Sequence, residues 1–341
     1  DALNDFKATG KFVVAYSKFY DQSAYHIAAL ADKSFVHPLG GVDFRGFAAQ
    51  IPFFKNMLDK VGIKMQAIYA GQFKSATEPY RLTEMSEQNR QQTREFLEDI
   101  QRNFMTDIAT SRNLSVAQLN AVANSYQALQ ADKAVSSGLV DQVGYEDEAF
   151  TEIRDRIGLE ADEKIPMVTL NDYAKANPRD KKFGAGSKIA VVYAEGTIVD
   201  GEGENGQTGD EKYVKILREI RKDDKIKAIV LRVNSPGGSA VASENMWREL
   251  VLAKEEGKNI VVSMGDYAAS GGYYIAAPAD AIVAAPATVT GSIGVILARP
   301  DASALFARTG VRAEVIAEGV AAPDAAGGLA SLGLPWGPDA L

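Results

Sequence analysis

The stretch Tyr273-Tyr-Ile-Ala-Ala-Pro-Ala-Asp280 has a near copy earlier in the chain, Tyr25-His-Ile-Ala-Ala-Leu-Ala-Asp32, 248 positions before it (273 minus 25). The same offset aligns Phe12-Val-Val-Ala-Tyr16 with Ile260-Val-Val-Ser-Met264. The register continues without a gap through further matched positions: Pro38 and Pro286, Gly46 and Gly294, Pro52 and Pro300, Gly62 and Gly310, Gly71 and Gly319. A constant register over this length indicates an internal duplication, so the chain is expected to contain two copies of one structural unit.

This duplication predicts the domain organisation. Residues 1–176 correspond to the C-terminal part of the first repeat, residues 177–187 form a polar linker, and residues 188–341 form the second repeat. Because the second repeat begins near Lys188, the equivalent start of the first repeat falls before the first residue (188 minus 248). The second repeat is also shorter than the first at its C-terminal end. We therefore expect both repeats to be truncated, and the sequence leaves the order of segment 323–341 open.

The composition narrows the range of functions. The 341 residues include 46% hydrophobic and 24% charged residues, typical of a soluble globular protein, and the net charge is −8. No basic stripe offsets this acidic balance, so a nucleic-acid partner is not expected. The chain has no cysteine and two histidines, which excludes thiol chemistry and argues against a metal site or a metal cofactor. No apolar run reaches the length of a membrane span.

The hydrophobic pattern predicts the fold class. Short β-branched runs over residues 188–198, 226–233 and 259–263 are typical of buried strands, and residues 210–221 and 239–256 between them have a helical pattern. This alternation predicts a parallel α/β layer. The tail of the first repeat is expected to be helical. Its features are the capping box Ser115-Val-Ala-Gln118 and a stripe expected in the core: Leu119, Val122, Tyr126, Leu129.

Two glycine-rich segments follow predicted strands. In Asp266-Tyr-Ala-Ala-Ser-Gly-Gly-Tyr-Tyr274, a serine stands at a strand-to-helix turn, where free N–H groups favour a developing oxyanion. Asn234-Ser-Pro-Gly-Gly238 follows another strand and could supply a second N–H group, or simply form a turn. By itself, Ser270 is better explained as a helix N-cap than as a nucleophile. Together the two segments suggest one site at the carboxyl edge of the sheet.

A nucleophilic serine needs a base. His26 lies in an apolar helical run and His37 beside a proline, so neither is a good candidate. Lys74, after a predicted strand, could act as a base if burial lowers its pKa. The repeat favours this pair. Under the 248-residue offset Ser270 aligns with Gln22, and Lys74 aligns with Ala322, so each repeat keeps one of the two residues.

The motifs resemble those of the signal peptide peptidase A family in its long, two-repeat form. They extend from about Lys11 to Gly319 and are Gly71-Gln-Phe-Lys-Ser-Ala-Thr-Glu-Pro79, Ser137-Gly-Leu-Val-Asp141, Asn234-Ser-Pro-Gly-Gly238, Ala269-Ser-Gly-Gly-Tyr-Tyr274 and Thr290-Gly-Ser-Ile-Gly-Val295. The resemblance implies a ClpP/crotonase-like α/β fold made of repeated β-β-α superhelix units. It also implies a Ser–Lys dyad in which Ser270 is the nucleophile and Lys74 the general base. Carried onto this chain, the oxyanion donors would be the N–H groups of Gly271 and Gly238, and Ser292 is a candidate for orienting the lysine.

The family also implies partners and a location. These are peptide substrates, chiefly released signal peptides, and a homotetramer on the periplasmic face of the bacterial inner membrane, held by an anchor that this sequence does not include. No cofactor is implied. Small apolar residues near the nucleophile are expected to form shallow substrate pockets: Val241, Ala242, Ala268, Ala269. Two alternatives stay open, an acyl-CoA enzyme of the crotonase type and a catalytically inactive scaffold or fragment.

Overall fold

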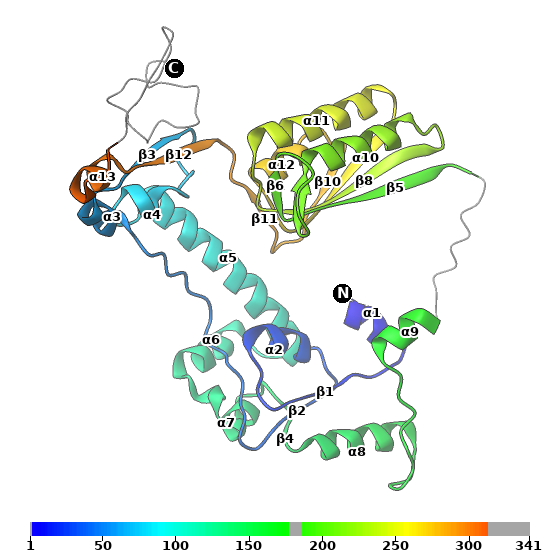
Figure 1. Cartoon of the computed structure of the whole chain (residues 1–341). Helices are drawn as coiled ribbons and strands as arrows, with labels where there is room; N and C mark the ends of the chain where they lie inside the picture. The colour runs from blue at the N-terminus through cyan, green and yellow to red at the C-terminus, as the bar shows by residue number, and fades with distance from the viewer. Residues whose placement is uncertain (1, 177–185, 313–341) are drawn as a thin grey trace. The chain divides into compact units, whose positions relative to one another are not determined.

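The chain forms two compact units that are discontinuous in sequence. The computed structural model describes residues 2–176 and 186–312 (Figure 1). The first unit comprises Asp1–Ala48 and Phe96–Lys182, and the second comprises Ala49–Glu95 and Phe183–Leu341. The segment that carries Lys74 therefore packs with the second repeat and not with the remainder of the first.

The compact units thus differ from the predicted repeats. The division into residues 1–176, 177–187 and 188–341 concerns the duplication of the sequence, and it remains a prediction. Residues 177–185 of the predicted linker and the segment 323–341 lie outside the described residues.

The first unit is a small parallel sheet covered by helices. Its strands have the order β1-β2-β4. The core of the unit contains Phe104 and Ile108 of the long helix α5, together with Leu119. The described elements are α1 (Ala2–Ala8), β1 (Val14–Ser17), α2 (Gln22–Ala28), β2 (Lys33–Val36), α5 (Glu87–Arg112, which begins in the second unit), α6 (Val116–Ser125), the 3₁₀ helix η1 (Gln127–Leu129), α7 (Ala131–Ser136), β4 (Gln142–Val143), α8 (Glu146–Ile157) and α9 (Leu170–Ala176).

The predicted start of α6 is confirmed, but the predicted apolar stripe is buried only in part. The capping box is confirmed, because the Ser115 hydroxyl accepts from the Gln118 N–H and the Gln118 side chain accepts from the Ser115 N–H. Leu119 is buried as expected, whereas Tyr126 and Leu129 are exposed. The helix ends at Ser125, and Tyr126 takes a left-handed backbone conformation with φ 56°. The helical period stops there, so the last two positions of the stripe were assigned wrongly to the core.

The second unit contains the predicted parallel α/β layer. Its main sheet has the order β10-β9-β8-β5, with β11 also paired to β9, and every pairing is parallel. Helices α10 and α11 lie side by side on one face of this sheet (Figure 1). Leu231, Met246 and Val262 are fully buried between these layers. The described elements are α3 (Lys55–Val61), β3 (Lys64–Tyr69), α4 (Glu78–Arg81), β5 (Lys188–Glu195), β6 (Thr197–Val199), β7 (Gln207–Gly209), α10 (Asp210–Lys222), β8 (Ile226–Ser235), α11 (Ala240–Glu255), β9 (Asn259–Ala269), α12 (Gly271–Ala276), β10 (Ala281–Val283), β11 (Val289–Gly291), β12 (Ile296–Asp301) and α13 (Ser303–Thr309).

The predicted strand over residues 188–198 is in fact two strands. Gly196, with φ 78°, separates β5 from β6, and β6 leaves the main sheet to pair with β7. This departure matters for the site, because Ile198 of β6 then reaches the turn after β8.

The 248-residue offset holds for elements as well as for sequence. Helices α3 and α13 begin and end 248 positions apart, and each ends at a glycine with a left-handed backbone, Gly62 and Gly310. Helices α2 and α12 correspond in the same way, except that α12 starts one residue later, at the position after Ser270.

An antiparallel pair of strands joins the Lys74 segment to the second repeat. Strand β3 pairs with β12 from Lys64 opposite Asp301 to Tyr69 opposite Ile296. Just beyond the pair, the Ala70 N–H donates to the Val295 carbonyl at 3.0 Å. The chain therefore leaves β3 beside the loop that follows β11, and Lys74 lies four residues further on.

Candidate active site

Ser270 stands in an unusual backbone conformation between β9 and α12. Its φ is 53° and its ψ is −117°, a region that L-residues rarely adopt. The Ser270 N–H donates to the Gly291 carbonyl at 2.9 Å. Although Ser270 occupies the N-cap position of α12, its side chain makes no capping hydrogen bond. The simple capping explanation therefore does not account for the serine, whose hydroxyl is directed elsewhere.

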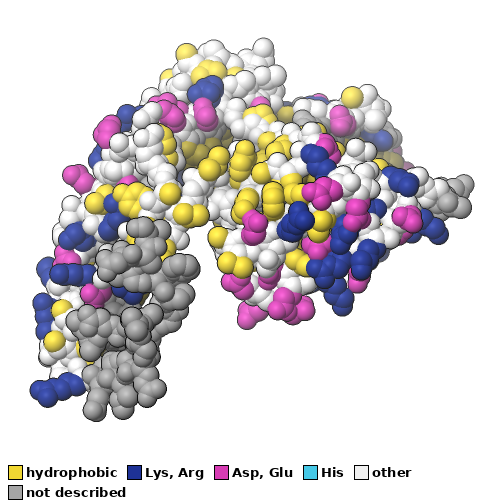
Figure 2. All heavy atoms as spheres, turned by 90° about the horizontal axis from the view of Figure 1, so that it is seen from above, with side chains coloured by type: hydrophobic (Ala, Val, Ile, Leu, Met, Phe, Trp, Pro, Cys, Tyr) yellow, Lys and Arg dark blue, Asp and Glu magenta, His cyan; other side chains and the backbone are white. Residues whose placement is uncertain are grey.

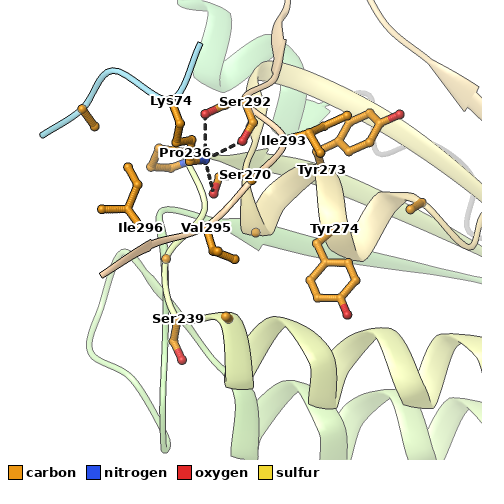
Figure 3. A pocket seen from close by; sticks show the side chains of 16 residues that line it. Lys74, Pro236, Ser239, Ser270, Tyr273, Tyr274, Ser292, Ile293, Val295 and Ile296 are labelled. Carbon is orange, nitrogen blue, oxygen red and sulfur yellow. Dashed lines mark hydrogen bonds between the residues drawn. The ribbon is translucent and has the colours of Figure 1, made fainter. Parts of the chain in front are cut away.

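The hydroxyl is directed toward Lys74. The Lys74 Nζ lies 3.0 Å from Ser270 Oγ, 3.0 Å from Ser292 Oγ and 2.5 Å from the Ser292 carbonyl oxygen. Figure 3 shows the three residues converging, with the lysine coming from the segment after β3 and Ser292 from the loop after β11. Three residues that the sequence predicted as site residues thus form one hydrogen-bonded cluster.

The surroundings of Lys74 favour its neutral form. Only 7% of the residue is exposed, and burial lowers the pKa of its ammonium group. Within residues 2–176 and 186–312, no carboxylate lies within ion-pairing distance of its Nζ. As an ammonium group it could donate to all three neighbouring oxygens. As a neutral amine it could donate to Ser292 and accept the proton of Ser270.

The turn after β8 lies against Ser270 and Gly271. A Cβ built on Gly237 would lie 2.8 Å from Ser270 Cβ, and one built on Gly271 would lie 3.2 Å from the Gly238 nitrogen. Among the described residues, the Gly238 and Gly271 N–H groups have no hydrogen-bond acceptor. Two free donors therefore lie close to Ser270 and to each other.

Ile198 holds this turn in place. Its N–H donates to the Gly237 carbonyl at 3.0 Å, and its carbonyl accepts from the Ser239 N–H at 2.9 Å. A Cβ on Gly238 would lie 1.9 Å from the Ile198 carbonyl oxygen, so only glycine fits there.

A cleft of about 690 Å³ opens over these groups. Lys74, Ser270 and Ser292 line it together with a mostly apolar wall: Ala76, Pro236, Tyr273, Tyr274, Ala277, Ile293, Val295, Ile296. The expected pocket residues Val241, Ala242, Ala268 and Ala269 are not among the residues that line it. That prediction was wrong because Ala242 and Ala268 belong to the hydrophobic core, Ala269 is buried, and the exposed Val241 lies outside the cleft.

The sequence did not predict two buried hydroxyl groups near the site. Ser235 Oγ accepts from the Gly237 N–H at 3.1 Å, and Ser243 Oγ lies 2.5 Å from where a Cβ on Gly271 would stand. Ser235 lies within the quoted motif, but no sequence signal marked Ser243, which α11 places there. The histidines lie in the first unit, where His26 pairs with Asp107 and His37 packs on the Tyr145 ring.

Comparison with known proteins identifies the family of this chain. The profile of peptidase family S49 matches residues 5–160 and 252–325. The chain belongs to peptidase family S49. It is 35% identical to Protease 4 of Haemophilus influenzae, over 92% of this chain and 52% of that protein. It is 32% identical to the chloroplastic serine protease SPPA of Arabidopsis thaliana, over 92% of this chain and 47% of that protein.

One solved structure matches only a part of the chain. A membrane-bound stomatin-specific protease in complex with a substrate peptide shares 26% identity with this S49 chain over 31% of it and 45% of that protein, with a TM-score of 0.25. So small an overlap supports no inference about this chain. The S49 chain spans about half the length of the curated relatives it matches.

The described residues contain neither a membrane-spanning helix nor a cluster of metal ligands. Within the described ranges, no helix combines the length and the apolar character needed to cross a membrane. Over the same residues, no group of three or more histidines and carboxylates is arranged to hold a metal ion.

Proposed function

We propose that this chain carries the catalytic dyad of a serine endopeptidase, with Ser270 as nucleophile and Lys74 as general base. One observation carries the proposal: a buried lysine amine, without a carboxylate partner among the described residues, lies 3.0 Å from the hydroxyl of a strained serine. Burial lowers the pKa of a lysine held in this way and so favours the neutral amine, which can accept a proton.

The reaction follows from these positions. Neutral Lys74 takes the Ser270 proton as Ser270 Oγ attacks a peptide carbonyl carbon, which gives a tetrahedral oxyanion and an ammonium group. The free N–H groups of Gly271 and Gly238 stabilise the oxyanion. Lys74 then returns the proton to the leaving amine, and an acyl-enzyme remains. Water, deprotonated by Lys74, hydrolyses the ester and restores the serine.

Ser292 has two roles in this scheme. Its hydroxyl and its carbonyl accept hydrogen bonds from the Lys74 amine, which leaves the lone pair of the neutral amine aimed at Ser270. Its carbonyl also stabilises the transient ammonium group. Ser292 is therefore proposed as the residue that orients the base.

The cleft supports extended, apolar peptides as substrates. Its wall exposes more apolar than polar atoms, and Tyr273, Ile293 and Val295 line it (Figure 3). Released signal peptides have this character.

The relationship to Protease 4 supports the finer proposals: a ClpP/crotonase-like fold, a homotetramer, and a location at the periplasmic face of the bacterial inner membrane. Figure 2 shows basic and acidic side chains side by side on the described part of one face.

Active-site labelling and peptide cleavage test the dyad. A fluorophosphonate probe should label the full chain at Ser270, and an apolar fluorogenic peptide should be cleaved. Ser270→Ala and Lys74→Ala should each abolish both signals, while Lys55→Ala, at an exposed lysine of the same unit paired with Asp59, should retain them. Labelling that survives in Lys74→Ala at the rate of the parent chain would remove Lys74 as the base. Turnover of an acyl-CoA without peptide cleavage would favour the crotonase alternative.

A further inference from the structure

Glu78 is a buried carboxylate close in sequence to the proposed base. Only 2% of the residue is exposed, and its side chain is almost wholly enclosed. It accepts hydrogen bonds from the Ser86 N–H at 3.1 Å, the Ser86 hydroxyl at 2.6 Å and the Asn89 amide at 2.9 Å. Arg81, 3.7 Å away, is the charged side chain that faces it. The proposed chemistry makes no use of this group.

The carboxylate is ionised in this setting. Burial alone would raise the pKa of Glu78, but the hydrogen bonds from Ser86 and Asn89 and the charge of Arg81 outweigh burial and lower it. A buried charge that loses its partners is strongly destabilising, so these contacts fix the position of Glu78 closely.

Those contacts tie the lysine-bearing turn to helix α5. Ser86 and Asn89 belong to the start of α5, since the Ser86 hydroxyl accepts from the Asn89 N–H and its carbonyl accepts from the Arg90 N–H. The Glu78 N–H donates to the Ser75 carbonyl at 2.9 Å, and Ser75 directly follows Lys74.

A second contact joins the same two segments. The Gln92 amide of α5 donates to Ser75 Oγ at 3.4 Å. The turn from Gly71 to Glu78 is thus held on one side by Ser292 in the loop before β12, and on the other side by α5.

We infer that Glu78 is a positioning residue for Lys74, and that its carboxylate holds the lysine turn against α5 so that the amine stays enclosed and within reach of Ser270. The inference rests on the proposed function only where it calls Lys74 the base. Its structural part concerns the environment of one amine and can be measured without any peptidase activity.

The experiment compares Glu78→Gln with Glu87→Gln in the full chain. Glu87 is in the first turn of α5 with an exposed side chain, so its variant removes the same charge nearby without touching the Lys74 turn. Competitive labelling with acetic anhydride across a pH series, read by mass spectrometry, reports the protonation of Lys74 itself. In Glu78→Gln the Lys74 titration should move upward toward that of an exposed lysine, because water reaches the amine. The Glu87→Gln titration should match the parent chain.

Activity gives the second readout. In Glu78→Gln, kcat at neutral pH should fall about ten- to hundred-fold with KM little changed, as expected when a catalytic group is displaced by about 1 Å. If Glu78→Gln does not fold, Ser86→Ala removes the 2.6 Å bond more gently and should shift the Lys74 titration in the same direction. A Lys74 titration that is identical in the parent chain and the folded variant overturns the inference. A parent chain that shows a depressed Lys74 titration but no cleavage overturns the proposed function instead.

Discussion

Gly294 lies where the two segments that carry Lys74 and Ser292 meet. A Cβ at this position would stand 2.1 Å from the Ala70 carbonyl oxygen and 3.7 Å from Lys74 Cδ. Its backbone has φ 131°, which L-residues rarely adopt. Gly294→Ala would therefore push the chain before Lys74 away from the loop that holds Ser292.

The required movement can be worked out from these distances. Ordinary contact begins at 3.4 Å, so the Ala70 carbonyl and the new methyl group must separate by about 1.3 Å, the difference between 3.4 and 2.1 Å. A displacement of about 1 Å between catalytic groups costs about 100-fold in rate. We therefore expect the rate of fluorophosphonate labelling at Ser270, and kcat/KM for an apolar peptide, to fall about 100-fold.

Gly257→Ala is the matched control. Gly257, just after helix α11, also has a left-handed backbone, with φ 85°, but a Cβ there would meet nothing within 4 Å. It should lose about 1 kcal/mol of stability from backbone strain and keep most of its labelling rate. Equal labelling rates in the two folded variants would show that the 2.1 Å contact does not set the position of Lys74.

Two further predictions concern stability. Burial lowers the pKa of Lys74, so the folded state disfavours the ammonium form. The contribution of this group to the free energy of unfolding is therefore fully present above the unfolded pKa of about 10.5. It is lost as the pH falls through the lowered pKa of the folded state. Lys74→Met should therefore raise Tm at neutral pH, and the gain should shrink as the pH is raised toward 10.5, as measured by calorimetry across a pH series; a gain independent of pH would contradict this. In the first unit, Asp141 accepts from the Ser34 N–H and hydroxyl and pairs with Arg112 at 2.6 Å. Arg112→Ala should destabilise that unit by about 1–2 kcal/mol in denaturant melts while the labelling rate of Ser270 stays unchanged; loss of labelling in the folded protein would argue against separate units.

The sequence by itself determined the duplication, the parallel α/β layer and the identity of the cluster. These follow from local signals: the 248-residue register, β-branched runs and glycines at strand ends. The pairing of Ser270 with Lys74 also came from sequence, because the register aligns them with Gln22 and Ala322 and so shows one partner kept in each repeat. Their expected proximity agrees with the 3.0 Å separation.

Tertiary structure decided what no local pattern encodes. The β3–β12 pairing joins strands more than 200 positions apart, and it assigns the Lys74 segment to the second unit. Side-chain direction also required the fold: the sequence placed Ala268 beside the substrate, but strand β9 turns it into the core. The burial of Glu78 likewise could not be read from the sequence, because a glutamate in a polar turn is usually solvated. Helix α5 encloses this one. The sequence names the groups proposed to react, and long-range packing sets the distances between them and the dielectric environment around them.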